Sequence, residues 1–192
     1  MVFEPNVIPA RIVIGVTGHR HLEAKPWLIE EIQEAILKIR EMIPAGIKTP
    51  IQLTVLSPLA EGADRLVAEE VLKLPGTTLK VVLPVEKNDY MRDFETAESK
   101  AEFAGLISRA ESIDILTVAN SRDEAYEQVG HYVVDQCDVL ITLWDGKSSA
   151  GRGGTEEIVD YARSRGCPLI WIHSGKPGKI TFEARPCPEE VS

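Results

Sequence analysis

The stretch "VLITLWDGKSSAGRGGTEEIVDYARSRGCPLIWIH", residues 139–173, decides the fold. It begins with a short, mostly apolar run at 139–145, which is typical of a strand buried on both faces of a parallel sheet. A gap rich in glycine and serine follows, and then a helical pattern at 155–166 that ends in Gly166, a residue preferred just after a helix. A second apolar run at 167–173 completes a strand–helix–strand unit, whose two strands are expected to lie parallel.

The same alternation of strand and helix patterns extends toward the N-terminus. Further strands are predicted at 11–16, 51–59, 76–85 and 112–118, and further helices at 21–43, 61–74 and 121–138. The charged segment 86–110 has a helical tendency and is expected to be loosely attached, and residues 174–192, rich in Pro and Gly, are expected to form a tail. Alternating strands and helices predict one α/β domain over 1–192 with its core at 11–173, built as a three-layer, doubly wound, mostly parallel sheet.

Composition and charge narrow the function. The chain has 192 residues and a formal net charge of -9, which argues against sequence-independent nucleic-acid binding because that draws on Lys and Arg. A local positive pocket for a small anionic ligand remains compatible with this charge. The N-terminus lacks the basic and apolar regions of a signal peptide, and no apolar run approaches the roughly 18 residues of a membrane span. We therefore expect a cytoplasmic protein without a membrane partner.

The cysteines support the same compartment. Cys137, Cys167 and Cys187 form no Cys-x-x-Cys pair, and their number is odd. Cys137 and Cys167 stand in apolar surroundings, which predicts buried free thiols. Free thiols suit a reducing cytosol.

Three predicted strands end in loops that combine glycine or other small residues with an arginine. The loops are "GVTGHR" at 15–20, "SPLAEGADR" at 57–65 and "DGKSSAGRGGT" at 145–155, and their arginines are Arg20, Arg65 and Arg152. In open α/β sheets, ligands bind outside the carboxyl ends of the strands, near the point where the strand order reverses. All three loops should therefore open on one edge and form a binding site.

The third loop has the features of a phosphate site. Gly153, Gly154 and Thr155 would place backbone N–H groups and the positive end of a helix dipole at the mouth of the cleft. Thr155 could donate to a phosphate oxygen. The alternative is a flexible loop that ends in Thr155 as a helix cap, with Glu156 and Glu157 merely favourable in the first turn.

The other two loops supply further candidates. Thr17, Gly18, His19 and Arg20 would line the floor of the site, with the Arg20 guanidinium holding phosphate or carboxylate in a bidentate manner. The alternative is a simple turn, with His19 as a capping or surface residue. Neither loop matches the G-x-G-x-x-G pattern or the Walker lysine motif.

Acidic residues near these loops could bind the rest of a nucleotide. Glu61 and Asp64 could accept hydrogen bonds from a ribose or a base, although Asp64 could equally cap the helix that follows it. Asp145 stands directly after a strand, where groups that bind sugar hydroxyls are common. The four histidines show no metal-ligand spacing with Cys or paired acids, so we expect neither a metal nor another cofactor.

Taken together, the motifs "GVTGHR", "SPLAEGADRLVAEEVL", "VLITLWDG" and "GRGGTEEIVDYARSRGCPLIWI" resemble the SLOG superfamily over residues 11–173. That superfamily includes DNA-processing protein A, LOG-type (lysine decarboxylase-like) phosphoribohydrolases and molybdenum-cofactor carrier proteins. The resemblance implies a Rossmann-like fold, a nucleotide or nucleotide-derived ligand and a homo-oligomer, often a dimer. It places the ligand phosphate over Gly153, Gly154 and Thr155, with Gly15, Thr17 and Gly18 opposite and Gly62 and Ala63 beside it.

One departure from the superfamily bears on catalysis. LOG-type hydrolases carry P-G-G-x-G-T-x-x-E, and the position of the last glutamate is Ile158 here. Glu156 and Glu157 precede it, and each residue along a helix turns a side chain by about 100°. We therefore place the binding or sensing of a phosphorylated, nucleotide-like ligand first. The alternatives are an N-glycoside hydrolase or transferase acting on nucleoside monophosphates through Glu156, Glu157 or Glu61, and a regulatory subunit with vestigial loops.

Overall fold

The computed structural model describes residues 9–42, 50–116, 119–148 and 153–183. Its strands are β1 (Ala10–Gly18), β2 (Ile51–Ser57), β3 (Thr78–Leu83), β4 (Ser112–Ile115), β5 (Val139–Trp144), β6 (Leu169–His173) and β7 (Ile180–Glu183). Its helices are α1 (Pro26–Glu41), α2 (Ala63–Leu72), α3 (Lys87–Tyr90), the short 3-10 helix η1 (Met91–Asp93), α4 (Ala97–Ile107), α5 (Arg122–Gln136) and α6 (Thr155–Ser164). The predicted alternation of strands and helices is therefore present.

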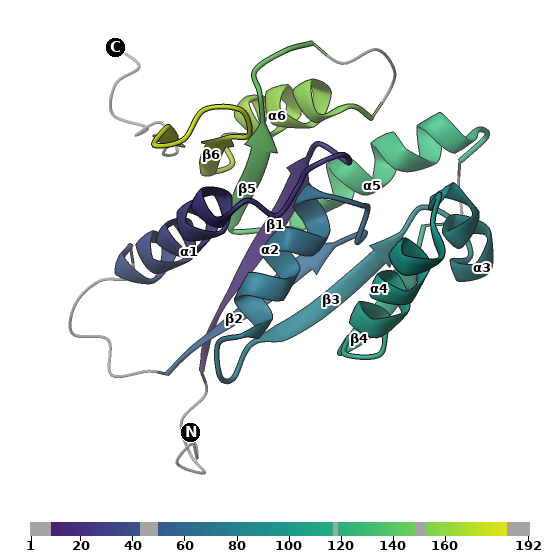
Figure 1. Ribbon diagram of the computed structural model, residues 1–192, viewed down its shortest axis with the longest axis horizontal. Coiled ribbons are helices and arrows are strands. Elements are labelled where there is room, and N and C mark those ends of the chain that lie inside the picture. The colour runs from purple at the N-terminus through teal and green to yellow at the C-terminus, as the bar shows by residue number, and fades with distance from the viewer. Residues whose placement is uncertain (1–8, 43–49, 117–118, 149–152, 184–192) are drawn as a thin grey trace.

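The strands form one sheet in the order β4-β3-β2-β1-β5-β6-β7. The first six run parallel, and β7 runs antiparallel to β6. The chain builds outward from β1 to β4 on one side and then crosses back to place β5 on the other side of β1 (Figure 1). The strand order thus reverses between β1 and β5, and in such sheets this is where a ligand is expected.

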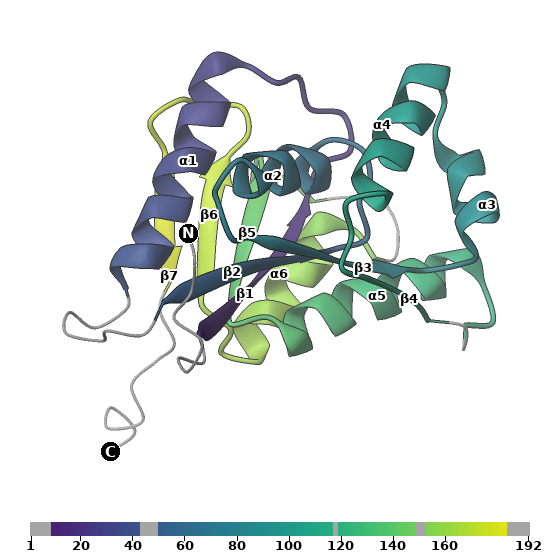
Figure 2. The same cartoon turned by 90° about the horizontal axis from the view of Figure 1, so that it is seen from below.

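Helices cover both faces of the sheet. Figure 2 shows α1, α2 and α4 on one face, and α5 and α6 on the other. The sheet residues alternate between two apolar clusters: Ile141 and Leu143 of β5 face the larger one, and Leu140 and Trp144 face the smaller. The predicted three-layer, doubly wound α/β class is confirmed. Within the described parts of the chain, none of the helices has the length and apolar character that a membrane span requires.

The helices follow the apolar spacing in the sequence. In α1, Leu28, Ile32, Ile36 and Ile39 recur every three or four residues and are almost completely buried. Pro26 stands at the start of the helix, where its missing N–H breaks no helical hydrogen bond. After α6, Gly166 has the positive φ of 64° typical of a residue just beyond a helix.

The strand β7 differs from the expectation of a tail over 174–192. Ile180–Glu183 pairs with β6 and forms the edge of the sheet. The strand is only four residues long and lies among Gly, Pro and Lys residues, and its Phe182 stays 45% exposed. Its stability comes from pairing with β6 rather than from an apolar pattern, so the local sequence does not reveal it.

The segment 86–110 is also not loosely attached as expected. Tyr90 and Phe103 have no exposed surface, and Phe94 is 3% exposed. Their rings contact one another, with the Tyr90 and Phe94 centroids 5.1 Å apart and the Phe94 and Phe103 centroids 5.0 Å apart. Aromatic pairs in this geometry stabilise a core beyond their area of burial. This cluster fixes α3, η1 and α4 to the sheet beside the candidate site.

Cys137 and Cys167 are free, as expected, but half-buried rather than fully buried. Their sulfur atoms lie 3.7 Å apart, because the end of α5 and the turn after α6 meet there. The contact with Cys167 and burial raise the pKa of the Cys137 thiol. Cys187 lies outside the described residues.

Candidate functional site

The three loops singled out in the sequence meet at one cavity of about 80 Å³ beside the reversal of strand order. The end of β1 and the loop after it contribute Thr17, Gly18 and Arg20. The loop after β2 and the first turn of α2 contribute Pro58, Ala60 and Asp64, and the residues around the start of α6 contribute Gly153 and Thr155. Tyr90 and one side of α5, including Tyr126, close the remaining walls. The expectation that the three loops open on one edge of the sheet is therefore confirmed. Tyr126 forms part of the cavity wall.

Arg20 brings a positive charge to this cavity. Its guanidinium carbon lies 4.7 Å from the centre of the Tyr126 ring, which is a cation–π distance. The tyrosine face therefore supports the guanidinium from one side, and the Arg20 side chain also hydrogen-bonds the Tyr126 side chain. Such a planar fork matches the oxygens of a phosphate or a carboxylate.

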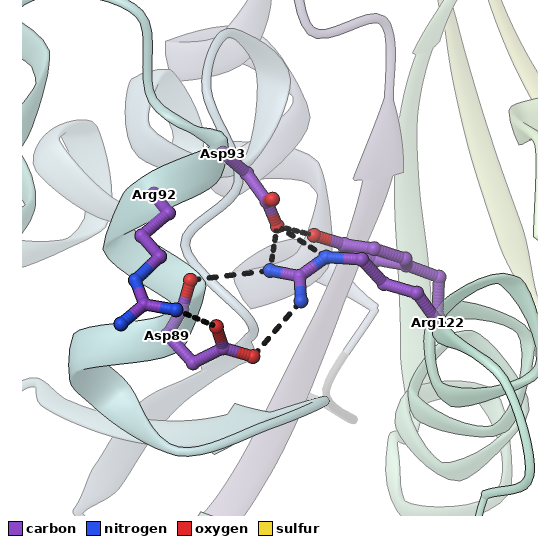
Figure 3. Close-up of polar contacts among 5 residues, drawn as sticks. Asp89, Arg92, Asp93 and Arg122 are labelled. Atoms are coloured by element: carbon purple, nitrogen blue, oxygen red, sulfur yellow. Dashed lines mark hydrogen bonds and ion pairs between the residues drawn. The ribbon is translucent and has the colours of Figure 1, made fainter.

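Figure 3 shows the network of Arg122, Asp89 and Asp93 at the start of α5. Tyr126 joins this network through Asp93. The Tyr126 hydroxyl donates to Asp93, which also accepts from Arg122 Nη2 at 2.7 Å and from Arg122 Nε at 3.2 Å. Arg122 Nη1 donates to Asp89 at 2.9 Å as well. Arg122 thus joins α5 to α3 and η1 and sets the position of the ring that contacts Arg20.

The Tyr90 hydroxyl has no hydrogen-bond partner within the described part of the chain, although Tyr90 is completely buried. Burial raises the pKa of this phenol well above its ordinary value, and the hydroxyl lies among the charges of Asp64, Arg20 and Arg65. A buried polar group without a partner costs roughly 1–3 kcal/mol. A ligand oxygen in the cavity would remove this cost.

Asp64 is the acidic residue of the cavity and is 4% exposed. Its Oδ2 accepts from Ser57 Oγ at 2.9 Å and from the backbone N–H of Ala60 at 3.2 Å. Burial raises its pKa to about 6. The carboxyl stands in the first turn of α2 and also organises the preceding loop, where Leu59 adopts a positive φ of 57°. The prediction that Asp64 caps α2 is wrong, because Gly62 is the N-cap residue and no side chain accepts a hydrogen bond there. A ligand-binding role for Asp64 stays a prediction.

The start of α6 lies at the cavity, which Gly153 and Thr155 line. Gly154 is the N-cap residue, and glycine has no side chain to satisfy the first-turn donors. Thr155 follows, lines the cavity and is 8% exposed. Gly153 has a φ of 74°, and a Cβ there would lie 2.9 Å from the backbone nitrogen of Glu127, so this position requires glycine. Arg152 lies outside the described residues.

The two glutamates at the start of α6 are engaged within their own loop. Glu157 Oε2 accepts from the N–H of Gly153 at 2.7 Å, and Glu156 Oε1 accepts from Ser148 Oγ at 2.9 Å. The third catalytic candidate, Glu61, accepts from Ser99 Oγ. These three glutamates are not among the described residues that line the 80 Å³ cavity, and its acidic wall residue is Asp64.

Several predicted ligand residues serve packing. Gly15 faces α5, where a Cβ would lie 2.8 Å from Cys137 Sγ, and Gly18 packs against Ala63 and β5. Gly62 has a φ of 76°, and a Cβ would lie 2.3 Å from the carbonyl oxygen of His19. Ala63 is fully buried and its N–H donates to that same carbonyl at 3.0 Å. Gly62 and Ala63 thus hold the first two loops together.

His19 and Asp145 form a pair beside the cavity. His19 Nε2 lies 3.0 Å from Asp145 Oδ1, and Lys147 Nζ lies 3.0 Å from Asp145 Oδ2. The backbone N–H of Lys147 is the largest influence on the Asp145 carboxyl, and together with the side chains of Lys147 and His19 it lowers the pKa. This pair joins the loop after β1 to the loop after β5, as the reversal of strand order requires.

A second, larger cavity of about 340 Å³ adjoins the first through Arg20. Glu61, Arg65 and Ser99 line it. Arg65 Nη1 donates to the Ser99 hydroxyl at 2.8 Å and to the Ser99 carbonyl at 2.9 Å. Glu61 and Arg65, both predicted from the second loop, therefore belong to this cavity.

One group of side chains could hold a divalent cation, although the sequence predicts no metal site. Of the described residues, Glu127, His131 and Glu157 place their ligand atoms within 4.8 Å of one another. Imidazole and carboxylate are ligands for Zn²⁺ and similar ions. Glu127 and His131 are four residues apart on α5, a spacing visible in the sequence, but Glu157 joins them only through the packing of α6 on α5.

Sequence reasoning missed Tyr90 as a site residue. Tyr90 comes from the segment 86–110, which is mostly charged. The available signal was the spacing of Tyr90 and Phe94, four residues apart, which places two aromatic rings on one side of a helical turn.

No protein-family model matches this chain, and no curated protein sequence matches it. Among solved structures, it is similar to the X-ray structure of DNA processing protein A (DprA) from Streptococcus pneumoniae. The TM-score is 0.53 and the identity 13%, over 85% of this chain and 50% of that one, so this chain spans half the length of that protein. At this identity the likeness concerns the fold alone, and the chain has a Rossmann-like α/β fold.

Proposed function

We propose that the protein binds a phosphorylated, nucleotide-derived ligand at the carboxyl edge of its sheet, with the phosphate in the 80 Å³ cavity. The observation that carries this proposal is the buried Tyr90 hydroxyl, which has no partner among the described residues and belongs to a side chain that lines the same cavity as Arg20. Tyr90 would donate one hydrogen bond to a phosphate oxygen, and Arg20 would supply the opposite charge.

The backbone supports the same ligand class. The glycine cap of α6 leaves first-turn N–H groups at the cavity, and the helix dipole adds partial positive charge there. The location between the ends of β1 and β5 is where open α/β sheets bind ligands. The SLOG resemblance of the motifs, together with the DprA-like fold, favours a nucleotide or a derivative of one.

Volume limits what enters the cavity. About 80 Å³ suffices for a phosphate group but falls well below the roughly 300–1,000 Å³ of whole-ligand pockets. The rest of the ligand must therefore lie outside this cavity.

The structure favours binding without turnover over hydrolysis or transfer at an N-glycosidic bond. Glycoside hydrolysis uses two carboxyl groups placed on either side of the reacting bond. Glu156 and Glu157 are held by Ser148 and by the Gly153 N–H, and the described residues that line the small cavity include one carboxyl group, that of Asp64. This arrangement favours a ligand that is held rather than cleaved.

The test is calorimetry and thermal unfolding of the whole chain with inorganic phosphate, AMP, ADP and ATP. We expect saturable binding of phosphate and of at least one nucleotide, with a rise in Tm. Tyr90→Phe removes only the hydroxyl and should weaken binding by about tenfold or more, since a hydrogen bond to a charged group contributes roughly 1.5–3 kcal/mol. Arg20→Gln should weaken it further.

Arg163→Gln is the matched control, because Arg163 pairs with Glu183 at the opposite end of α6. It should bind as the wild type does. The proposal is overturned if phosphate and the nucleotides give neither heat nor a Tm shift. Chromatographic detection of free base released from AMP would contradict the binding role and support a hydrolase or transferase.

A further inference from the structure

Three side chains with metal-ligand atoms converge where α6 packs on α5. Glu127 and His131 are four residues apart on α5 and so lie on one face of that helix, and Glu157 comes from the first turn of α6. One ligand atom from each side chain lies within 4.8 Å of the other two. Zn²⁺ bonds of about 2.0–2.2 Å place ligand atoms roughly 3–4 Å apart, so small side-chain rotations suffice to close the site.

The packing of the two helices sets the backbone of this group. Gly130 of α5 allows α6 to approach closely, since a Cβ there would lie 2.3 Å from Ile158 Cδ1. Ile158 directly follows Glu157, so this contact fixes how far Glu157 stands from α5. The ligands thus belong to two packed helices and are half-buried, and sites on such elements are more precise than sites on loops.

Two of the three ligands are also held in orientation by neighbours. The His131 ring stacks on the Tyr161 ring with their centroids 3.8 Å apart, and the Tyr161 hydroxyl donates to Asp135 at 3.0 Å. Glu157 Oε2 accepts from the N–H of Gly153 at 2.7 Å. A carboxylate that accepts one hydrogen bond keeps further lone pairs for a metal, and partners of this kind are what orient metal ligands in proteins.

The donor set decides which ions fit. Two carboxylates this close repel each other, and a dication between them would offset that repulsion. Imidazole nitrogen and carboxylate oxygen are both good ligands for Zn²⁺. Ca²⁺ and Mg²⁺ prefer oxygen ligands alone, so the single imidazole counts against them.

We propose that Glu127, His131 and Glu157 form a binding site for a divalent transition metal, and that Zn²⁺ fits it best. Three protein ligands leave a fourth tetrahedral position for a water molecule or for an oxygen of a ligand. Gly153, which lines the 80 Å³ cavity, borders this site through its hydrogen bond to Glu157. The metal site does not depend on the proposed function, because the triad exists whether or not phosphate binds.

The test is calorimetric titration of the whole chain, treated with EDTA and desalted, with Zn²⁺ or Mg²⁺ alone. Zn²⁺ should bind saturably and raise the Tm, and Mg²⁺ should bind at least tenfold more weakly. His131→Gln and Glu157→Gln should each weaken Zn²⁺ binding by at least about tenfold, because losing a residue that only orients a ligand already costs roughly 10–100-fold. Glu157→Gln keeps an oxygen that can accept from Gly153. The visible absorption of bound Co²⁺ should change in His131→Gln, which reports loss of the imidazole ligand.

His21→Gln and Glu30→Gln are the matched controls, since both residues are exposed. They should bind Zn²⁺ as the wild type does, and the Tm of each metal-free variant checks that it is folded. The proposal is wrong if Zn²⁺ does not bind saturably or if Mg²⁺ binds equally well. Zn²⁺ binding that is unchanged in His131→Gln and Glu157→Gln would place the metal elsewhere, for example on cysteine thiols, and would also overturn it. Failure of phosphate to bind would leave the metal site standing.

Discussion

Gly62 lies where the loop after β2 approaches the loop after β1. A Cβ at this position would lie 2.3 Å from the carbonyl oxygen of His19 and 2.4 Å from that of Arg20. These neighbours are backbone atoms, so they cannot rotate away as the end of a side chain can. The position of Arg20, and hence the charge in the candidate site, therefore depends on the absence of one methyl group.

Gly62→Ala should destabilise the protein by about 2–4 kcal/mol, because it combines a strained positive φ with a backbone collision. Guanidinium unfolding measures this change. Gly105→Ala is the matched control: Gly105 is an exposed residue of α4 with open space at its Cβ position. Alanine there should be neutral or stabilise by up to about 1 kcal/mol. Equal effects of the two substitutions would contradict the close approach.

Asp64 predicts a pH dependence of stability. Its pKa in the folded protein is raised by burial to about 6, above the ordinary value of 3.8. The folded state therefore binds more protons than the unfolded state between these pH values, and the free energy of unfolding falls as pH rises from about 4 to about 6. Above about pH 6, the contribution of the protonated Asp64 to the free energy of unfolding is lost completely.

Asp64→Asn keeps an oxygen that can accept from Ser57 and Ala60 but removes the charge. Urea unfolding at pH 4.5 and pH 8 should show the variant gaining about 1–3 kcal/mol relative to wild type at the higher pH. Asp160→Asn, at a side chain that is 66% exposed, should show no comparable change. A constant difference between Asp64→Asn and wild type at both pH values would rule out a shifted carboxyl.

Helix α5 connects the distant segments of the site. Its first residue, Arg122, contacts Asp89 of α3 and Asp93 of η1 (Figure 3). Tyr126 lies one turn later, with its ring against the Arg20 guanidinium. The aromatic contacts of α3 and α4 hold the other end of this arrangement in the core. The wall of the small cavity therefore depends on an ion-pair network that does not itself line it.

Arg122→Gln should lower phosphate affinity by about threefold to fivefold, since Tyr126 loses its positioning, while stability falls by only about 1 kcal/mol because the pairs are partly exposed. Calorimetry with phosphate measures the first effect. Arg92→Gln is the control, because Arg92 contacts the same Asp89 at 3.2 Å but is 80% exposed. The interpretation fails if both variants weaken binding equally.

At the scale of the whole molecule, the sheet has a protected centre and two short edges. β1, β2 and β5 each pair on both sides, whereas β4 and β7 pair on one side only and have four residues each. Ile113 and Phe182 on these edges are both 45% exposed. Stability should therefore fall from the centre of the sheet toward both edges.

Hydrogen exchange followed by mass spectrometry checks this gradient. Amides of β1, β2 and β5 should exchange slowest, and those of β4 and β7 at least about tenfold faster, because edge strands open without unfolding the core. Protection of β7 equal to that of β5 would mean that another surface covers this edge.

Sequence patterns predicted the centre of this architecture better than its margins. Strands such as β5, buried at every position, are evident as apolar runs, and three glycine-rich loops correctly indicated one edge. β7 was missed because pairing rather than composition makes it a strand. Tyr90 was missed because the segment that carries it is mostly charged, although its aromatic residues point into the core. Neither the pairing of β7 nor the burial of Tyr90 can be deduced from the sequence motifs alone.

The reversal of strand order has a consequence for biosynthesis. Gly15 of β1 pairs with Leu140 of β5, so one side of β1 stays without its partner until most of the polypeptide has left the ribosome. An open, apolar strand edge readily pairs with foreign chains. This side of β1 is therefore the part of the sheet most open to mispairing while the chain is being synthesised.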